Sequence, residues 1–438
     1  MAHNVPTTPE QFQADCAGQN ISLPFESDTA VLGSKITVKK TDFANRIVYQ
    51  AMEGCDGTPE GIPGELTRRR YLRFAEGGAG LIWFEATAVV REGRANPRQM
   101  FLDENTLDAY RRIVEEIKET GMKANGFEPV VFCQLTHSGR YSKPNGTPDP
   151  IIAYHNPVLE EKAPVDDSHI ITDDQLDRVS EKLAAGAVLA QKAGFDGADI
   201  KSCHRYLLSE LLSGYQRDGK YGGSFENRTR MLRQTAADAI ARCPQDFIIT
   251  SRLNAYDGLA YPNGFGVTPE SGTTPDFTEA IALVQALEEI GMTMIDITMG
   301  NPYFNPHINR PFASGTYVPP EHPLCGVNRM LAGTAQIRKN VKIPVICSGI
   351  SWLGAVSPNV MAGCIQNNWF EFAGYGRESI AYPDAAKDIC TTGALNPKKL
   401  CITCGKCTEI MRAGGTPGCV IRDSATYLPI YKERCMKP

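Results

Sequence analysis

Four cysteines near the C-terminal end are the most closely spaced reactive residues in this sequence. Cys401, Cys404 and Cys407 recur at every third position, and Cys419 follows after eleven intervening residues. Three adjacent thiolates and a remote fourth suit a [4Fe–4S] cluster, because the triplet holds one face of the cube and the fourth ligand closes it. Structural zinc also takes four cysteines, but its usual layout is two separated C-x2-C pairs. Zinc is therefore the second interpretation, unligated thiols are the third, and Cys435 is not expected to be a ligand.

Eight β-rich segments alternate with amphipathic, helix-like segments in front of these cysteines. The expected strands lie at 46–52, 79–90, 129–135, 197–201, 247–253, 293–298, 343–349 and 369–376. The expected helices lie at 64–78, 107–121, 172–194, 226–242, 277–291, 328–340, 353–368 and 384–393. Strands joined through helices are parallel, and eight such units favour a closed (β/α)8 TIM barrel over an open doubly wound sheet. The helix at 107–121 is expected to stop at Gly121, and Thr172 is expected to cap the helix that follows it.

The strand pattern also indicates at which end of the barrel the active site is expected. Two Pro- and Gly-containing insertions, 137–171 and 254–275, follow expected strands, so they would lie on the C-terminal rim where barrel active sites are built. We expect a barrel domain over 1–395 and a cysteine-rich extension over 396–438. No G-x-G-x-x-G follows a strand, so the phosphate-binding turn of a separate dinucleotide domain is not visible.

The composition is that of an ordinary globular chain and argues against several classes of partner. The 438 residues include 45 basic and 50 acidic side chains, for a net charge of −5, which gives no general footprint for nucleic acid or an anionic membrane. No apolar run approaches the ~20 residues that span a bilayer. The N-terminal residues lack the basic start and apolar block of a secretory signal. We expect a cytoplasmic protein in which disulfides are disfavoured.

One long stretch resembles a known family. The run GFDGADIKSCHRYLLSELLSGYQRDGKYGGSFENRTR resembles the strand-4 signature of the Old Yellow Enzyme group of flavin oxidoreductases, which ends in the motif found here at Tyr221–Arg228. The resemblance continues in order through NRIVYQAM, GGAGLIWFEATAVV, CQLTHSGR, VICSGI and GYGRESIAYPD, and covers roughly residues 33–385.

The resemblance implies an FMN bound across the barrel mouth. Gln134 is then expected to read the pyrimidine edge of the flavin, and Arg252 to lie beside N1 and O2, where it would stabilise the negative charge of the reduced ring. The other implied cofactor-binding residues are Ala51, Met52 and Ala86 along the ring, Ser348, and Gly349, Gly376 and Arg377 at the phosphate.

On the substrate side, the resemblance implies catalytic roles for Lys201, His204 and Tyr206. Tyr206 fits a general acid, since a tyrosine with its ordinary pKa near ~10 is protonated at neutral pH. His204 can donate a hydrogen bond to an oxygen that becomes negative. Lys201 replaces the first histidine of the family pattern; it either holds an enolate, carboxylate or thioester oxygen, or pairs with a neighbouring acid and has no chemical role.

Three further side chains depart from the pattern or extend it. Glu53 follows the strand-1 methionine, where a carboxylate near the ring would lower the flavin potential unless it turns away. Tyr303 and His307 follow strand 6, and either is a candidate second acid or a structural residue.

The cysteine set after the barrel resembles a subgroup that includes trimethylamine dehydrogenase and 2,4-dienoyl-CoA reductase, which implies a [4Fe–4S] centre exchanging single electrons with FMN. Those relatives continue into a second half that binds a nucleotide, whereas this chain stops 19 residues after Cys419. We therefore expect NAD(P)H to reduce FMN directly, or a separate electron-transfer protein to act through the cluster.

The leading functional hypothesis is an ene-reductase that transfers hydride to the activated C=C of an α,β-unsaturated carbonyl, carboxylate or thioester. The second is an amine dehydrogenase or demethylase that exports electrons through the cluster. The third is a non-catalytic flavin electron carrier with structural zinc. All three leave the oligomeric state open, and a homo-oligomer is possible on this sequence.

Overall fold

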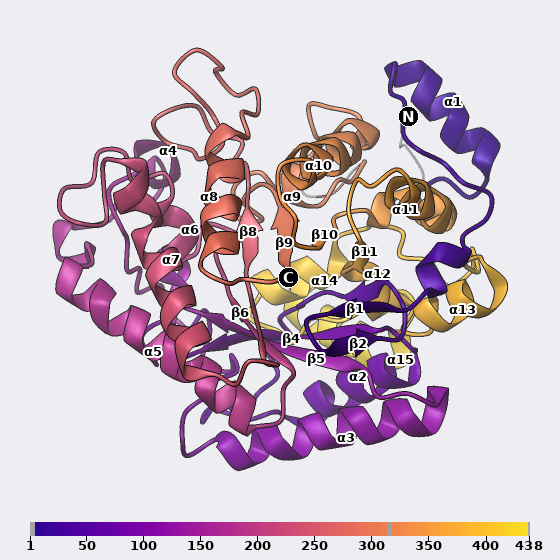
Figure 1. The fold of residues 1–438 in the computed structure, drawn as a ribbon, viewed down its shortest axis with the longest axis horizontal. Helices are drawn as coiled ribbons and strands as arrows, with labels where there is room; N and C mark the ends of the chain where they lie inside the picture. The colour runs from indigo at the N-terminus through magenta and orange to yellow at the C-terminus, as the bar shows by residue number, and fades with distance from the viewer. Residues whose placement is uncertain (1–4, 314, 316, 437–438) are drawn as a thin grey trace.

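The computed structural model describes residues 5–313, 315 and 317–436, and the strands in these ranges form a closed parallel barrel (Figure 1). Its strands are β3 (Ile47–Tyr49), β4 (Leu81–Ala88), β5 (Val130–Thr136), β6 (Gly197–Ile200), β7 (Ile248–Thr250), β8 (Arg252–Asn254), β9 (Ile295–Thr298), β10 (Val345–Cys347) and β11 (Phe372–Tyr375). Only Ser251 separates β7, which pairs with β6, from β8, which pairs with β9. The two short strands therefore occupy one strand position in the barrel, and the predicted (β/α)8 barrel is confirmed.

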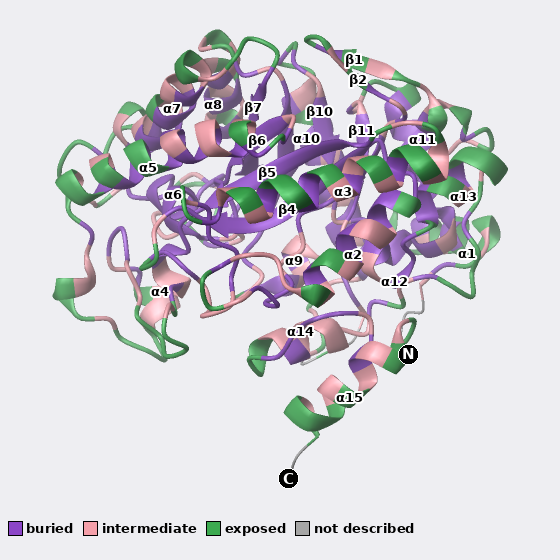
Figure 2. Ribbon diagram, turned by 90° about the horizontal axis from the view of Figure 1, so that it is seen from below, coloured by how far each residue is buried: buried purple, intermediate pink, exposed green. Residues whose placement is uncertain are grey.

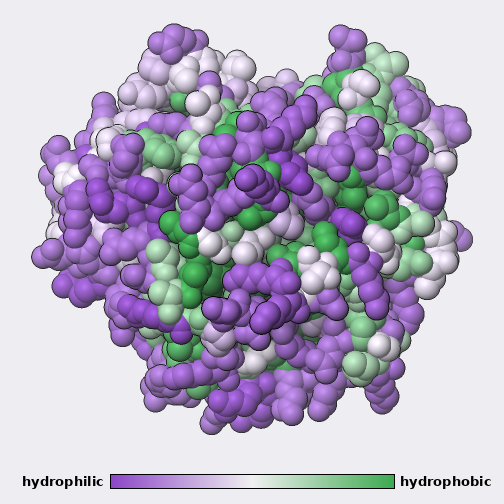
Figure 3. Space-filling model, viewed as in Figure 1, coloured by the Kyte–Doolittle hydropathy of each residue, from purple (hydrophilic) through white to green (hydrophobic). Residues whose placement is uncertain are grey.

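The barrel interior is filled by large apolar side chains and closed at one end by a hairpin. Strands β1 (Ile36–Val38) and β2 (Thr41–Phe43) pair in antiparallel fashion. Phe43 from this hairpin packs edge-on against Phe372 and Phe132, with ring centroids 5.1 and 6.3 Å apart. Fully burying a side chain of this kind contributes about 1.5–3 kcal/mol. The hairpin thus seals the end of the barrel opposite the strand C-termini, and Figure 3 shows that this face is largely hydrophilic outside.

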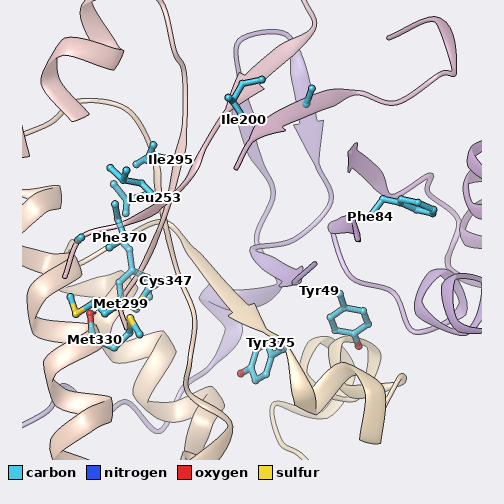
Figure 4. Close-up of a cluster of buried hydrophobic side chains, with 14 of the residues drawn as sticks. Tyr49, Phe84, Ile200, Leu253, Ile295, Met299, Met330, Cys347, Phe370 and Tyr375 are labelled. Atoms are coloured by element: carbon cyan, nitrogen blue, oxygen red, sulfur yellow. Dashed lines mark hydrogen bonds between the residues drawn. The ribbon is translucent and has the colours of Figure 1, made fainter. Parts of the chain in front are cut away.

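A ring of helices covers the outside of the strands. The helices that alternate with strands are α2 (Glu65–Glu76), α3 (Leu107–Asn125), α5 (Asp173–Lys192), α7 (Phe225–Arg242), α8 (Thr278–Glu289), α10 (Pro323–Arg338), α11 (Ser357–Gln366) and α13 (Ala385–Thr392). The main apolar core lies between these helices and the outer faces of the strands. Figure 4 shows part of it, including Tyr49 and Tyr375, which are register partners on adjacent strands.

The ends of two helices can be compared with the cap and the stop predicted from the sequence. Thr172 caps α5 as predicted: its hydroxyl accepts from the Gln175 amide at 3.2 Å, and Gln175 Oε1 accepts from the Thr172 amide at 2.8 Å. The predicted stop of α3 at Gly121 is wrong, because the helix continues to Asn125 and ends on Gly126, whose φ is +78°. A Cβ at Gly121 would lie 2.4 Å from Pro129 Cδ. Gly121 therefore permits close packing rather than a helix end.

Short elements and loops build the rim at the strand C-termini. The first insertion carries η2 (Gly139–Tyr141), α4 (Pro157–Glu160) and η3 (Asp167–His169). The remaining short elements are α1 (Pro9–Gln19), η1 (Ala30–Gly33), α6 (Leu207–Leu211), α9 (Pro306–Asn309), η4 (Ser351–Val356) and α12 (Arg377–Ala381). None of the helices in the described ranges has the length and apolar character that a membrane crossing requires.

The residues after 395 form a small helical extension on the rim. It contains α14 (Lys406–Arg412) and α15 (Ser424–Cys435), which pack together through Ile410, Val420 and Tyr427. Figure 2 shows both helices at the end of the barrel opposite the β1–β2 hairpin. Asp423 fixes the extension to α2 through ion pairs with Arg69 and Arg73 of 2.6 and 2.7 Å.

Candidate active site

One cavity of about 160 Å³ lies at the C-terminal ends of the barrel strands. All twelve residues expected to bind the cofactor or act on substrate line it: Ala51, Met52, Ala86, Gln134, Lys201, His204, Tyr206, Arg252, Ser348, Gly349, Gly376 and Arg377. They come from the ends of seven different strands, which a closed barrel brings together. The extension adds Cys407, Thr408, Met411 and Pro417 to the wall.

The deep end of the cavity is a layer of buried polar groups. Gln134 Nε2 donates to Asp199 Oδ2 at 2.6 Å, and the other oxygen of Asp199 accepts from the backbone amide of Arg252 at 2.7 Å. Burial raises the pKa of Asp199 to about 6. The Arg252 guanidinium lies 3.1 Å from Asp296 and donates to Ser348 Oγ at 3.3 Å. Gln134 and Arg252 are thus held rigidly with their remaining polar atoms available to a ligand.

Gln50 belongs to this layer but was not anticipated from the sequence. Gln50 is 1% exposed and lines the cavity; its side chain opposes the rise that burial causes in the pKa of the neighbouring Asp296, and its amide oxygen has no hydrogen-bond partner among the described residues. An unsatisfied buried amide oxygen costs about 1–3 kcal/mol, so such a group implies a polar ligand. The available signal was a polar residue at the end of the apolar strand that precedes Ala51.

Two arginines that form no ion pair with the described carboxylates, Arg310 and Arg377, also line the cavity. Arg377 is buried, and its side chain makes a long hydrogen bond of 3.5 Å to the carbonyl of Pro311. Arg310 donates to the Thr408 hydroxyl, and burial together with the Arg377 charge lowers the pKa of Arg310 to about 10. Two guanidinium groups that repel each other suit a doubly charged anion between them. Arg310 was missed because it lies in a loop outside every recognised fragment.

Gly349 also lines the cavity and has a φ of +86°, which a residue with a side chain rarely adopts. The glycine therefore lets the loop after β10 pass close to Met330 and to the carbonyl of Asn309, which a Cβ would approach within 3.2 and 3.3 Å.

The proton-donating residues stand on one side of the cavity. Tyr206 is 2% exposed, and its hydroxyl lies 2.8 Å from that of Tyr303. The Lys201 ammonium lies 3.9 Å from the centroid of the Tyr206 ring. Tyr303 stacks in turn on Tyr141 with ring centroids 3.9 Å apart. Burial raises the pKa of Tyr206 well above its ordinary value and lowers that of Lys201.

A strained turn presents His204 to the same space. His204 and Arg205 have φ values of +64° and +59°, a region that costs non-glycine residues about 1–3 kcal/mol. The buried ion pair of Arg205 with Asp257, at 2.8 Å, holds the turn. Burial and the charges of Arg252 and Lys201 keep the pKa of His204 well below its ordinary value, so the ring is neutral. Its buried Nε2 has no partner in the described structure.

The three side chains with open interpretations separate in space. Glu53 lines the cavity, and its carboxylate accepts from Asn96 Nδ2 at 2.9 Å. Burial raises the pKa of Glu53, while Lys201 opposes the shift. Tyr303 also lines the cavity. His307 is not among the lining residues; its Nδ1 lies 2.7 Å from the Tyr317 hydroxyl.

A second, much smaller cavity of about 20 Å³ adjoins the first and is lined by Cys401, Cys404, Cys407 and Cys419. Arg377, Ile380 and Cys407 line both cavities. Cys435 is not among the lining residues. Within the described part of the chain, no three His, Cys, Asp or Glu side chains are grouped so that they could hold a metal ion. The four thiols thus surround a space without converging on a single point.

The barrel and its mouth cavity define a class of protein. A cavity lined by polar amide and guanidinium groups and by two further arginines suits a flat polar ring with a terminal phosphate. This is the arrangement of flavin-dependent oxidoreductases built on a barrel.

The comparison with protein families gives the same class. Residues 34–395 match the sequence model of the NADH:flavin oxidoreductase / NADH oxidase family, and the chain belongs to this family. It is therefore a flavin-dependent oxidoreductase, and FMN is the cofactor that the family implies. The amide oxygen of Gln50 and the two arginines, which have no ion pair among the described residues, fit that cofactor.

Individual relatives are distant. An NADPH dehydrogenase of Clostridium acetobutylicum is 25% identical over 350 residues, covering 79% of this chain and 91% of the relative. The structure of 2-naphthoyl-CoA reductase in complex with 2-naphthoyl-CoA superimposes with a TM-score of 0.71 at 19% identity, covering 90% of this chain and 57% of the other. Histamine dehydrogenase from Rhizobium sp. 4-9 superimposes with a TM-score of 0.67 at 18% identity, covering 90% and 53%. The chain thus spans little more than half of these two larger proteins, and the likeness concerns the fold.

Proposed function

We propose that the protein is an ene-reductase that reduces the activated C=C bond of an α,β-unsaturated carbonyl, carboxylate or thioester. The observation that carries the proposal is the convergence of Lys201, His204 and Tyr206 on the cavity that also holds the expected flavin contacts. Such a reaction needs a protonated acid beside a site that binds a developing negative charge.

The protonation states of this trio support a reductive reaction. The raised pKa of Tyr206 keeps its hydroxyl protonated at neutral pH, so it can protonate the α-carbon. The neutral His204 ring donates one hydrogen bond to the activating oxygen, and the Lys201 ammonium adds positive charge there. FMN, when bound and reduced, supplies the hydride to the β-carbon.

Tyr303 supports Tyr206 as the proton donor. Its hydroxyl shares a hydrogen bond of 2.8 Å with Tyr206, so it can hold the Tyr206 oxygen in place and return a proton to it after each turnover. The stacked Tyr141, whose hydroxyl accepts from Asn301 Nδ2 at 2.7 Å, fixes the position of Tyr303. We therefore assign the second-acid role to Tyr303 rather than to His307, which lies among Tyr317 and Glu321.

The charge of the cavity favours this reading over amine oxidation. Three of the four basic residues that line it, Arg252, Arg310 and Arg377, are assigned to the flavin, so Lys201 and Glu53 are the charged residues left for the substrate. The Lys201 ammonium complements an enolate, carboxylate or thioester oxygen and repels a cationic amine.

A [4Fe–4S] cluster held by Cys401, Cys404, Cys407 and Cys419 is part of the proposal, and it would pass single electrons to the cavity. The four thiols line one cavity, and their spacing of three close cysteines and one remote cysteine, rather than two C-x2-C pairs, supports an iron–sulfur cluster over zinc. NAD(P)H remains the proposed alternative reductant of the flavin.

The test is anaerobic turnover with reduced methyl viologen or NADPH as donor. Cyclohexenone, cinnamate and crotonyl-CoA represent the three substrate types, and histamine and trimethylamine represent the amine reading. We expect saturated product from at least one unsaturated substrate and no flavin bleaching by the amines. Bleaching by an amine without any reduction of the unsaturated substrates would overturn the proposal.

A further inference from the structure

The extension differs sharply from the rest of the chain in charge. Residues 396–438 contain eight basic and three acidic residues, although the whole chain has more acidic than basic side chains, 50 against 45. All three acids are engaged: Asp423 pairs with Arg69 and Arg73, Glu409 accepts from the Tyr431 hydroxyl at 2.6 Å, and Glu433 lies 3.6 Å from Arg434. The positive charge of the extension is therefore concentrated and largely uncompensated.

Several of its basic side chains are free of carboxylates. The ion pairs of the described residues include none that involves the following five: Lys398, Lys406, Arg412, Arg422 and Lys432. Lys399 is different, because it lies 3.5 and 3.6 Å from Asp384 and Asp388. A solvated cluster of this kind attracts an acidic surface over several ångströms at low salt.

Apolar side chains are exposed within this basic surface at the thiol cavity. Ile402 is 47% and Ile421 is 38% exposed, and both line the cavity of the four cysteines. Lys406 and Arg422 line the same cavity. Exposed apolar residues surrounded by charge are the usual composition of a transient protein interface.

The position of the surface connects it to the active site. The thiol cavity shares Arg377, Ile380 and Cys407 with the mouth cavity, so one layer of residues separates the two. Figure 2 shows the extension at the mouth end of the barrel, with α15 reaching away from the body of the molecule. A partner seated on the extension would face the thiol cavity without covering the barrel.

We propose that the surface formed by Lys398, Ile402, Lys406, Ile421, Arg422 and Lys432 docks a small acidic one-electron carrier protein that delivers electrons through the thiol cavity. The proposal rests on the proposed cluster and on the reductive direction of the reaction. Reduction of one C=C bond consumes two electrons and two protons. Two carriers, each oxidised by one electron, supply the electrons, and the protons come from solvent, one of them by way of Tyr206.

The test compares two charge-reversed proteins that differ only in where the charges lie. The first is Lys398→Glu/Lys432→Glu, on the proposed surface. The matched control is Lys35→Glu/Lys40→Glu, two exposed lysines beside the β1–β2 hairpin at the opposite end of the barrel. Neither pair lines a cavity. A reduced plant-type [2Fe–2S] ferredoxin is the probe, and the second-order rate of flavin reduction is measured by stopped flow across a salt series.

We expect the wild-type rate to fall as salt rises, and the first variant to be about tenfold slower at low salt but equal at high salt. The control should match the wild type. Equal rates for all three proteins, or the same loss in the control, would overturn the proposal. Binding of duplex DNA as tight as that of ferredoxin at the same salt would also overturn it, since the surface would then attract any polyanion.

Failure of the docking and failure of the proposed function are separable. Methyl viologen reduces the protein without a docking surface, so enone reduction with that donor is measured on the same three proteins. Loss of ferredoxin coupling with normal viologen-driven turnover is the result the proposal predicts for the first variant. Salt-dependent ferredoxin coupling without enone turnover would retain the docking surface and reject the ene-reductase.

Discussion

Replacement of Tyr206 by phenylalanine is the most informative change in the site, because it removes one oxygen and leaves the buried ring in place. The hydroxyl of Tyr206 is the proposed proton donor and shares a hydrogen bond of 2.8 Å with Tyr303. Positioned acid catalysis contributes about 10²–10⁴ in rate. We therefore expect Tyr206→Phe to slow reduction of the unsaturated substrate by about 10²–10³.

The companion change, Tyr303→Phe, should have a much smaller effect. It removes one neutral hydrogen bond to Tyr206, worth about 0.5–1.5 kcal/mol. At 1.36 kcal/mol per tenfold in rate, that energy corresponds to about two- to tenfold. Because Tyr303 is proposed to act through Tyr206, the double variant should be no slower than Tyr206→Phe alone.

Stopped-flow absorbance separates the two half-reactions in this assay. Flavin reduction by the donor should be unchanged in all three variants, whereas reoxidation by the enone should slow as described. Reoxidation of Tyr206→Phe at the wild-type rate would refute the assignment. A further large loss on adding Tyr303→Phe would show that Tyr303 donates a proton independently of Tyr206.

Three other predictions follow from the same geometry. Lys201→Met should cut turnover by at least tenfold. The wild-type rate should fall at alkaline pH, because the lowered pKa of Lys201 makes its ammonium lose charge at a lower pH than an ordinary lysine, and this fall should be absent from the variant. His204 is already neutral and should add no inflection to the pH–rate profile between pH 6 and 8. Arg377→Gln should weaken FMN binding by about 10- to 100-fold, in line with about 1.5–3 kcal/mol for a charged hydrogen bond, yet leave the affinity for riboflavin unchanged in fluorescence titration. Arg70→Ala should destabilise the protein by about 3–5 kcal/mol in urea unfolding because it leaves two buried carboxylates unpaired, whereas Arg68→Ala, which breaks an exposed pair on the same helix, should cost under about 1 kcal/mol.

The barrel was predictable because each of its units carries a local signal. Apolar strand runs such as Leu81–Ala88 alternate with helices that have caps such as Thr172, so no long-range information was needed. The prediction that the helix ends at Gly121 was wrong because a glycine near the end of a helical pattern usually indicates a C-terminus. Here the glycine is needed because a side chain would collide with Pro129. Such packing contacts are invisible in a single sequence.

The site was predictable only where a family fragment covers it. Arg310 lines the cavity because of the course of its loop, and Gln50 because of the register of its strand. No local sequence pattern encodes either feature. Tyr303 and His307 are four residues apart, and only the fold of their loop places one inside the cavity and the other outside. The placement of the extension depends on Asp423 and its partners on α2, which are separated by about 350 residues of chain.

The central claim is that an FMN in the barrel mouth adjoins an iron–sulfur cluster held by the four thiols. Anaerobic purification followed by absorption spectroscopy and by flavin, iron and zinc analysis tests it most directly, on the wild type, Cys404→Ser and Cys435→Ser. We predict one FMN and about four irons per chain in the wild type and in Cys435→Ser, and loss of the iron with retention of FMN in Cys404→Ser. A colourless protein, or one zinc per chain in place of iron, would contradict the account.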